Sequence, residues 1–305
     1  MTTFSVTVLG SSSAIPTLTR NLSAHLLNVN ERLFLIDCAE GTQMQIRRYH
    51  IHFQRIKAIF ISHLHGDHYY GLIGLLTSFH LLGRKDELHI YGPPLLEEII
   101  DIQLKASQTK LLYPLKIHPV FDDSYRQIYE DDLMTVNAFP LQHSVPTVGF
   151  IFREKKQERK LRKEMISKIA LPVREMTRIK KGEDFIDANG KVYKNEILTT
   201  DPPKQRSYAY CSDTSYNESI IPYIQNSNLL YHEATFMQDM LAAAKDKLHA
   251  TASEAATIAM KANVKKLLIG HFSARYDDLE PLLKEARQVF EETYLAEDGA
   301  VHIIS

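Results

Sequence analysis

The stretch SHLHGDHYYG, residues 62–71, holds three histidines and one aspartate within six consecutive positions. It lies between the apolar segments KAIFI and GLIGLLTSFHLLG, where core-forming sequence would be expected to continue. His63 and His65 alternate at the end of a predicted strand, so both side chains can point to one side. Asp67 and His68 follow as the chain turns into a helix. Imidazole and carboxylate groups together suit zinc, with manganese or iron as substitutes, so this spacing predicts a metal site.

Three more polar residues end apolar runs elsewhere in the chain: His143 in FPLQHSVP, Asp213 in AYCSDT and His271 in LLIGHFS. Open α/β sheets present their chemistry at strand ends, so we expect these residues to join the metal site. Cys211, near Asp213, is interpreted as a small buried hydrophobic residue. Eight other histidines lack this setting or have a simpler structural interpretation: His25, His50, His52, His80, His89, His118, His232 and His302.

The elements that must position these residues are short strands alternating with helices. Strands are predicted at residues 5–10, 23–29, 32–37, 57–62, 87–92, 116–121, 134–139, 147–152, 207–212, 228–234, 266–271 and 300–305. Helical spacing of apolar residues occurs at 41–49, 71–82, 95–107, 218–225, 252–262 and 280–294. Two groups of strands, each flanked by helices, predict an α/β fold with helices outside two packed sheets, a four-layer αββα sandwich.

The composition is that of an ordinary globular protein, with 44% hydrophobic and 24% charged residues in 305. No apolar run reaches the ~18 residues needed to cross a bilayer, so no membrane association is expected. The start, MTTFSVTVLGSSS, has no basic segment before an apolar one and does not read as a signal peptide. Only Cys38 and Cys211 are present, too few for a disulfide framework, so a cytoplasmic location is expected.

Positive charge is concentrated in residues 153–181, where twelve Lys and Arg accompany four Glu, a local charge of +8 in a chain of net charge −1. Such a run is usually a solvated helix face. An excess this large also suits a polyanionic partner, because neutralised phosphates release counterions. Residues 153–206 are also turn-rich and poor in core-forming residues. We interpret them as an insertion projecting from a single domain of residues 1–305, and both interpretations of its charge stay open at this point.

The order HxHxDH, then His143, Asp213 and His271, resembles the metallo-β-lactamase superfamily and, more narrowly, the ribonuclease Z family. HEATF (232–236) and HATASEAA (249–256) make the narrower resemblance specific, and IDCAEGTQMQIRR, SDTSY and GHFSARY are also similar to family segments. The resemblance covers nearly the whole chain. It implies an endoribonuclease that removes the 3′ trailer from precursor tRNA, leaving a 3′-hydroxyl on the tRNA and a 5′-phosphate on the trailer.

The resemblance also implies two zinc ions with assigned ligands. One ion would be bound by His63, His65 and His143, the other by Asp67, His68 and His271, and Asp213 would bridge both. Two metal ions ~3.5–4 Å apart can hold an attacking hydroxide and the oxygens of an in-line phosphoryl displacement. Asp67 would orient the attacking water. Its service as proton acceptor is chemically less suitable, because a metal-bound carboxylate is a poor base.

His249 and Glu233 are the expected partners for the leaving group. The ribose 3′-oxygen leaves as a strongly basic alkoxide unless it is protonated, and a general acid contributes ~10²–10⁴ in rate. His249 precedes Thr251 and Glu254, a capping-box pattern that begins a helix. Glu233 could keep His249 protonated and in the correct tautomer. Without the family resemblance, a structural salt link would be the better interpretation of this pair.

RNA contacts and a homodimer are further implications of the resemblance. The expected substrate-binding residues are Arg20, Asn21, Arg159, Lys160, Arg162, Lys163, Lys180 and Lys181. The chain departs from the family in the loop Pro-x-Lys-x-Arg-Asn, which reads PTLTRN with Leu18 at the basic position. It also has ALPVREM where the inserted arm usually carries Gly-Pro. In the homodimer, the arm of one subunit would clamp tRNA at the other's active site, with residues 44–56 and 71–83 as contact surfaces or as core.

Other functions of the same fold are weighed against this one. A small-molecule phosphodiesterase, arylsulfatase or thioester hydrolase would need no long basic insertion, and a tRNA-binding assay separates it from the ribonuclease. A non-catalytic RNA-binding scaffold would have no need of seven intact ligands. A flavin-linked di-iron reductase would carry a Glu in the histidine motif and an appended flavodoxin domain. The tRNA-processing ribonuclease is therefore the leading hypothesis.

Overall fold

The computed structural model describes residues 3–305. The chain divides into two compact units. The larger, here the body, contains the residues up to Asp131, Thr135–Arg153 and Arg206–Ser305. The smaller, here the arm, contains Asp132–Met134 and Glu154–Gln205.

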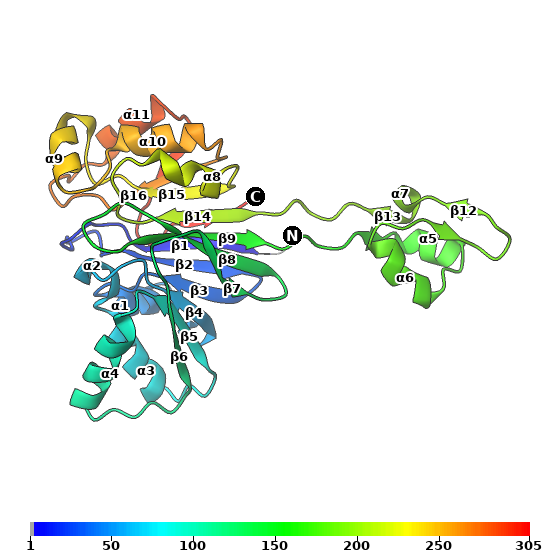
Figure 1. Cartoon of the computed structure of the whole chain (residues 1–305), viewed down its shortest axis with the longest axis horizontal. Helices are drawn as coiled ribbons and strands as arrows, with labels where there is room; N and C mark the ends of the chain where they lie inside the picture. Colours follow the sequence, from blue (N-terminus) through cyan, green and yellow to red (C-terminus); the bar gives the residue numbers. More distant parts are fainter. Residues whose placement is uncertain (1–2) are drawn as a thin grey trace. The chain divides into compact units, whose positions relative to one another are not determined.

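Seven strands form the first sheet of the body (Figure 1). In order across the sheet they are β18 (Val301–Ile303), β1 (Phe4–Gly10), β2 (Ala24–Val29), β3 (Arg32–Ile36), β4 (Ile56–Phe60), β5 (Leu88–Gly92) and β6 (Leu115–Pro119). The strands from β18 to β3 pair antiparallel, and those from β3 to β6 pair parallel. The carboxyl ends of four neighbouring strands therefore meet at one edge of this sheet.

The second sheet has a similar plan. Its order is β17 (Thr293–Leu295), β16 (Leu267–Gly270), β15 (Leu229–Glu233), β14 (Ser207–Cys211), β9 (Val148–Glu154), β8 (Met134–Pro140) and β7 (Arg126–Glu130). The strands from β14 to β17 pair parallel. Every residue of β14 and β15 is buried, as expected of strands covered on both faces. Aromatic rings fill the space between the sheets: the ring of Phe60 lies 5.6 Å from that of Phe150 and 5.2 Å from that of Phe152.

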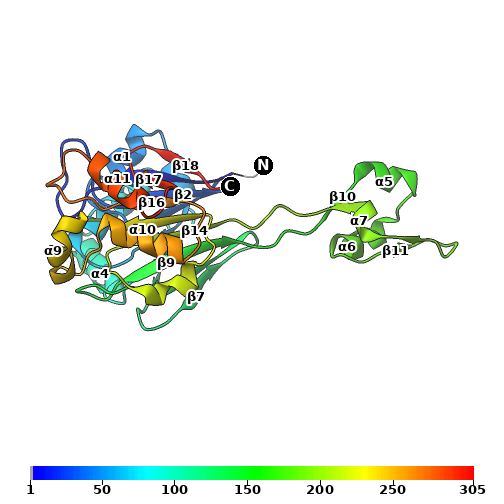
Figure 2. The same cartoon turned by 90° about the horizontal axis from the view of Figure 1, so that it is seen from above.

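Helices cover the outer faces of both sheets, which confirms the predicted α/β arrangement of four layers (Figures 1 and 2). The helices on the first sheet are α1 (Thr42–Arg48), α3 (Leu72–Leu81) and α4 (Leu96–Ala106). Those on the second are α8 (Ile221–Ile224), α10 (Ala252–Lys261) and α11 (Glu280–Arg287). The short elements α2 (Gly66–Tyr69), α9 (Leu241–Asp246), η1 (Phe53–Arg55), η2 (Glu218–Ile220) and η3 (Gln238–Met240) belong to the connections. No helix within residues 3–305 has the length and apolar character of a membrane span.

Two predicted helices differ from those observed. The helix predicted at 280–294 ends at Arg287, and β17 begins at Thr293. Val289 and Phe290 pack on the same core as α11, so their spacing continues the helical pattern after the helix has ended. The helix predicted at 218–225 is a 3₁₀ turn followed by the four residues of α8. Strand β7, which is partly exposed at the edge of its sheet, was not predicted.

The arm has a small hydrophobic core of its own, made by Leu171, Ile179, Phe185 and Leu198. Its helices are α5 (Lys163–Lys168), α6 (Val173–Lys180) and α7 (Asn195–Leu198). Two strand pairs join its segments: β10 (Lys160–Leu161) with β13 (Thr199–Thr200), and β11 (Phe185–Ile186) with β12 (Val192–Tyr193). These helices were not predicted, because basic residues dominate them and their few apolar residues serve only this small core.

Candidate metal centre

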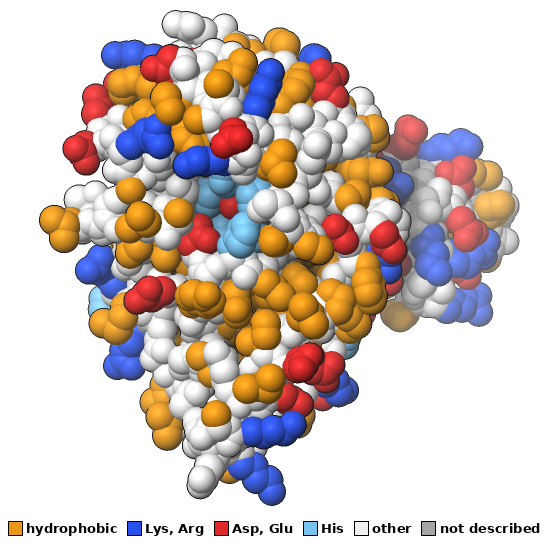
Figure 3. All heavy atoms as spheres, turned by 60° about the vertical axis from the view of Figure 1, so that its left-hand side comes forward, with side chains coloured by type: hydrophobic (Ala, Val, Ile, Leu, Met, Phe, Trp, Pro, Cys, Tyr) orange, Lys and Arg blue, Asp and Glu red, His pale blue; other side chains and the backbone are white. Residues whose placement is uncertain are grey.

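The predicted ligands lie where strands of the two sheets end. His63 follows β4, His143 follows β8, Asp213 follows β14 and His271 follows β16. His143, Asp213 and His271 line a hollow of about 520 Å³ together with His65 and Asp67, and His63 lies behind them, with its Nε2 atom 3.7 Å from Oδ2 of Asp213. Figure 3 shows histidine side chains gathered in one hollow of the body with carboxylates among them. Folding therefore brings together polar groups that are up to 208 positions apart in the sequence.

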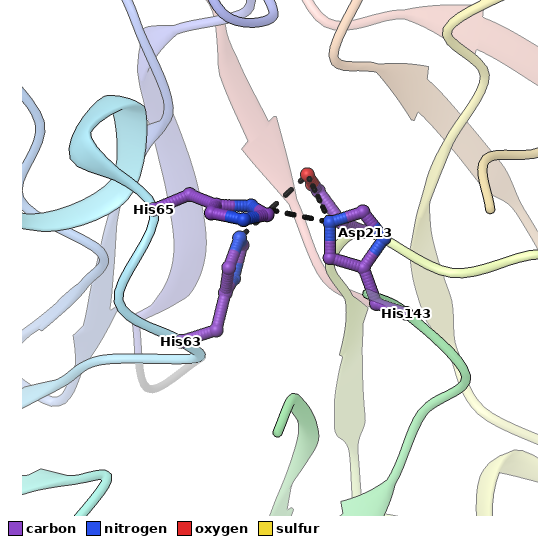
Figure 4. Close-up of side chains that lie close together, drawn as sticks. All are labelled: His63, His65, His143 and Asp213. Carbon is purple, nitrogen blue, oxygen red and sulfur yellow. Dashed lines mark hydrogen bonds and ion pairs between the residues drawn. The ribbon is translucent and has the colours of Figure 1, made fainter. Parts of the chain in front are cut away.

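The first group consists of His63, His65, His143 and Asp213, whose ligand atoms lie within 4.8 Å of one another. In Figure 4 the four side chains point toward a common centre. The Nδ1 atom of His65 lies 3.2 Å from the Nε2 atom of His143. The Oδ2 atom of Asp213 lies 3.6 Å from Nε2 of His143 and 3.7 Å from Nε2 of His63.

The second group consists of Asp67, His68 and His271. The Nε2 atoms of His68 and His271 are 3.3 Å apart, and Oδ2 of Asp67 lies 3.6 Å and 3.4 Å from them. The other oxygen of Asp213, Oδ1, lies 3.3 Å from each of the same two Nε2 atoms. Asp213 thus presents one oxygen to each group, which is the arrangement of a carboxylate that bridges two ions.

The spacing of these atoms fits metal coordination. Two donor atoms at about 2.0–2.1 Å from a tetrahedral zinc ion lie ~3.3 Å apart, as the facing nitrogens do here. Nε2 of His63 and Oδ1 of Asp213 are buried and make no hydrogen bond within residues 3–305. Buried polar atoms without a partner are costly, so a cation is the fitting occupant. These side chains make a cluster compatible with a metal site.

The ring nitrogens that face away from the centre have hydrogen-bond partners. Nδ1 of His143 lies 3.0 Å from the carbonyl oxygen of Leu248, and Nδ1 of His271 lies 2.9 Å from Oγ1 of Thr235. Nδ1 of His68 lies 2.8 Å from Oδ2 of Asp37. Such partners fix the tautomer and the orientation of metal-binding histidines. They leave Nε2 of each of these rings for the centre.

Asp37 is a residue of the site for which no role was predicted. It is fully buried at the end of β3 and accepts hydrogen bonds from the hydroxyl groups of Tyr210 (2.7 Å) and Ser62 (2.9 Å). Its backbone is left-handed, with φ of 55°, as is that of His271, with φ of 60°. Non-glycine residues in this region cluster at functional sites. The strand-end rule that identified His143 and Asp213 applies to Asp37 as well, and could have found it.

The aspartates of the centre are held as carboxylates. Burial alone would raise the pKa of Asp213, but the adjacent His271 and His68 hold it well below its usual range. Burial also opposes ionisation of Asp67, yet the hydrogen bond from His271 and the charge of His68 lower its pKa. The backbone N–H of Ala14 donates to Oδ2 of Asp67 at 2.7 Å. Two ionised carboxylates among histidines favour cations in this hollow.

His249 and Glu233 form a close pair beside the centre. Nδ1 of His249 donates to Oε1 of Glu233 at 2.7 Å, and Oε1 also accepts from the backbone N–H of Thr214. Burial lowers the pKa of His249, but the charge and hydrogen bond of Glu233 outweigh it and raise the pKa to about 9. The predicted capping box of Thr251 and Glu254 begins α10 and fixes the following helix. His249 also lies within ligand distance of Asp213 and His271, so its chemistry has to be separated from metal binding by experiment.

The residues predicted to contact RNA have varied surroundings. Arg20 is only 8% exposed, and the side-chain amide of Asn21 donates to Asp298 at 3.0 Å, which fastens the loop. In the arm, Arg159 pairs with Asp201, and Nε of Arg162 donates to a backbone carbonyl. The side chains of Lys160, Lys163 and Lys181 are exposed, and that of Lys180 is half-buried. A hollow of about 540 Å³ in the arm is lined by Lys156, Arg159, Lys180 and Lys181 among others.

Comparisons with known proteins identify the family. Residues 4–156 match the family model described as Anti-Pycsar protein Apyc1. The chain is 45% identical to Ribonuclease Z of Bacteroides fragilis over 301 residues, 98% of each chain. It is similar to the crystal structure of human tRNase Z, short form, with a TM-score of 0.72, 28% identity and 99% of both chains covered. A metallo-β-lactamase fold protein of Bacillus subtilis matches in fold, with a TM-score of 0.70 at 22% identity over 99% of this chain and 100% of that one. The chain therefore belongs to the ribonuclease Z family, hydrolases of the metallo-β-lactamase fold.

Proposed function

We propose that this protein is a zinc-dependent endoribonuclease that removes the 3′ trailer from precursor tRNA, leaving a 3′-hydroxyl on the tRNA and a 5′-phosphate on the trailer. One observation carries the proposal: seven His and Asp side chains converge in a chain 45% identical to Ribonuclease Z over nearly its full length. The name of its human structural relative, tRNase Z, supports tRNA as the RNA substrate.

Two zinc ions are the proposed cofactor. The first ion would be held by His63, His65 and His143, the second by Asp67, His68 and His271, and both by Asp213. When bound, the ions would stabilise charge on the phosphate oxygens and lower the pKa of the attacking water. The donor set of nitrogen and carboxylate oxygen supports zinc as the metal.

Asp67 is assigned the orientation of the attacking water. Its Oδ2 atom is already fixed by the N–H of Ala14 at 2.7 Å, so the carboxylate has a defined direction. Its lowered pKa makes it a weak proton acceptor. We therefore assign it a positioning role and no proton transfer.

His249 is assigned the role of general acid. Because Nδ1 donates to Glu233, the Nε2–H of the imidazolium is the group available to the leaving 3′-oxygen of the ribose. A pKa of about 9 keeps the ring protonated at neutral pH. Glu233 is fully buried and accepts four hydrogen bonds, so it holds the histidine in one orientation.

The arm is proposed to hold the body of the tRNA through its cations, with Lys160, Lys163 and Lys181 as exposed contacts. A homodimer is proposed as the assembly. In the expected contact helix α3, Leu75, Leu76 and Phe79 are buried in the core, whereas Leu81 is 75% and Leu82 54% exposed. The end of α3 rather than the whole helix is therefore the surface to test, by measuring the mass of a Leu81→Ser/Leu82→Ser variant in solution.

The test of the proposed function is a cleavage assay with nucleotide resolution. Purified protein with zinc is incubated with a precursor tRNA, and both new ends are mapped and identified chemically. We expect one cut at the 3′ side of the tRNA body, with the stated end groups, and its loss with a chelator. Hydrolysis of a small phosphodiester without any cut in the precursor would instead favour a small-molecule hydrolase of the same fold.

A further inference from the structure

The hollow of the metal centre carries two exposed side chains that the proposed chemistry does not use, Tyr70 and Lys247. Both line the hollow, and Lys247 is the only Lys or Arg among its described lining residues. They lie on connections of different sheets: Tyr70 directly follows α2, between β4 and β5 of the first sheet, and Lys247 directly follows α9, between β15 and β16 of the second. In Figure 1, α9 and α2 lie above and below the strand ends, and Figure 3 shows cations on one side of the histidine hollow and hydrophobic side chains on the other.

Tyr70 presents an aromatic ring to solvent in a fixed position. The residue is 64% exposed, although it follows the histidine motif directly. Its ring lies against Gly66, where an added Cβ would be only 2.3 Å from Cε2 of Tyr70. The ring of Tyr69 contacts it edge-on, with centroids 5.0 Å apart. Glycine between two metal ligands thus lets the ring lie beside the centre, and an exposed tyrosine held in place is a platform for a planar group.

Lys247 presents its charge from the connection between β15 and β16 of the second sheet. It is the C-terminal cap of α9, and its ammonium group lies 6.0 Å from the centroid of the Phe236 ring. The side chain is exposed, and the hydrogen bonds described for residues 3–305 do not include one from its ammonium group. Lys247 and His249 line the same hollow, so the cation lies in the pocket that also holds the proposed general acid. A lysine in this setting is a point charge available for a phosphate.

We propose that Tyr70 stacks on a base next to the cleaved phosphodiester and that Lys247 binds a neighbouring phosphate of the same strand, so that together they set the position of the cut. This inference rests on the proposed function, because it presupposes an RNA strand in the hollow. Stacking accepts every base, and a phosphate contact carries no sequence information, so the pair would fix position without demanding a sequence. Tyr70 and Lys247 are therefore positioning residues for the strand.

The test pairs changes in the protein with changes in the substrate. Tyr70→Leu is expected to raise KM by about 5- to 150-fold, the range for loss of one stacked base, and to scatter the cut over adjacent bonds. Tyr70→Phe and Tyr70→Trp should restore both values, because only the ring is needed. With the wild-type protein, a precursor with an abasic nucleotide beside the cut should show the same increase in KM. With Tyr70→Leu, the abasic nucleotide should cause no further increase in KM.

Lys247 is tested in the same way against a phosphate. Lys247→Ala should reduce the slope of log K against log[salt] for RNA binding by ~0.7–0.9. A single methylphosphonate at the contacted phosphate should weaken binding to the wild-type protein but leave binding to Lys247→Ala unchanged. Lys245→Ala, which removes an exposed cation two residues earlier and outside the hollow, is the matched control and should behave as the wild type.

The failure of this inference can be told from failure of the proposed function. If the wild-type protein does not cut precursor tRNA, the function itself is wrong. If it does, and Tyr70→Leu keeps both KM and a single cut site with unchanged zinc content, the stacking role is wrong. An abasic penalty of equal size in the wild type and in Tyr70→Leu would overturn it as well, since the base would then be read elsewhere.

Discussion

In the candidate metal centre Asp213 is buried, Asp67 is mostly buried and both have fixed neighbours, whereas in the arm most cations lie exposed on a unit with a core of four buried residues. Asp213 is 2% exposed and contacts both ligand groups. Lys194 and Arg178 of the arm pair with acidic residues on the surface, where water and salt screen an ion pair and a phosphate can replace the carboxylate. Metal binding at the centre therefore depends on the positions of single atoms, whereas the proposed RNA binding by the arm depends on the sum of many weak charge interactions.

This difference predicts that one substitution abolishes the centre, whereas the arm fails only when many residues change. The largest effect is expected for Asp213→Ala. Because Asp213 faces both ligand groups, each site would lose a ligand, and zinc content after desalting should fall well below one ion per chain. Asp122→Ala, which removes an exposed carboxylate of the body, is the control and should keep its zinc. Retention of two tightly held ions by Asp213→Ala would refute the bridging role.

The next effect is expected for removal of the arm. Deleting Lys155 to Thr200 and closing the gap with a short Gly/Ser linker removes most of the positive cluster and none of the proposed ligands. Binding of precursor tRNA should weaken by ~10²-fold or more, and about 0.7–0.9 of salt slope should vanish per lost phosphate contact. Hydrolysis of a small phosphodiester should survive, because the centre is built by the body alone.

A milder variant separates charge from fold in the arm. Serine at Lys160, Lys163, Lys168 and Lys181 removes cations that are all exposed and leaves the arm core intact. It should flatten the salt slope in part and change thermal stability little. If either arm variant loses zinc together with both activities, the arm is a structural brace and its proposed role is wrong.

His249→Ala is expected to slow the chemical step of cleavage while it keeps both zinc binding and RNA binding. Single-turnover cleavage should fall by ~10²-fold or more, the size of a lost general acid, at unchanged zinc content and RNA affinity. A substrate with a nitrophenolate leaving group needs no proton, so its hydrolysis should fall much less. Loss of zinc in this variant would show instead that His249 acts as a ligand beside Asp213 and His271.

The candidate metal centre could be predicted from the sequence because His63, His143, Asp213 and His271 each follow an apolar run, and the strands that these runs form end close together in the two sheets. His143 and Asp213 are identified by this pattern alone. The hydrogen-bond partners of the histidine nitrogens that face away from the centre could not be predicted from this pattern. One of them is the backbone carbonyl oxygen of Leu248, which any residue type could supply. The position of the Tyr70 ring could not be predicted either, since the ring packs against Gly66, where a Cβ would lie only 2.3 Å from Cε2 of Tyr70.

The arm was harder to predict for a related reason. The spacing of Met165, Ile166 and Ile169 is helical, but these residues serve a core too small to produce a long apolar pattern. The basic residues between them dominate the composition, so the segment reads as turn-rich and solvated. For α11 the predicted helix was too long rather than missing. It ends at Arg287, but Phe290 packs on the core from outside the helix and continues the apolar pattern.

The smallest effect is expected for Asp37→Asn, which tests how far fixed geometry extends beyond the ligands. Asparagine also tolerates the left-handed backbone of this position, so the fold should be retained. Asparagine lacks the negative charge of Asp37. Its NH₂ group would also replace one acceptor oxygen, so it would face a donor: either the backbone N–H of Ser62, or the group formed by the hydroxyls of Tyr210 and Ser62 and Nδ1 of His68. Loss of such an outer partner typically weakens metal binding by ~10- to 100-fold, which competition with a chelator would measure.

Tyr210→Phe removes only one of the donors and should have a smaller effect. If Asp37→Asn binds zinc as tightly as the wild type, the orientation of His68 is fixed by packing alone, and the dependence on single atoms ends at the ligands themselves.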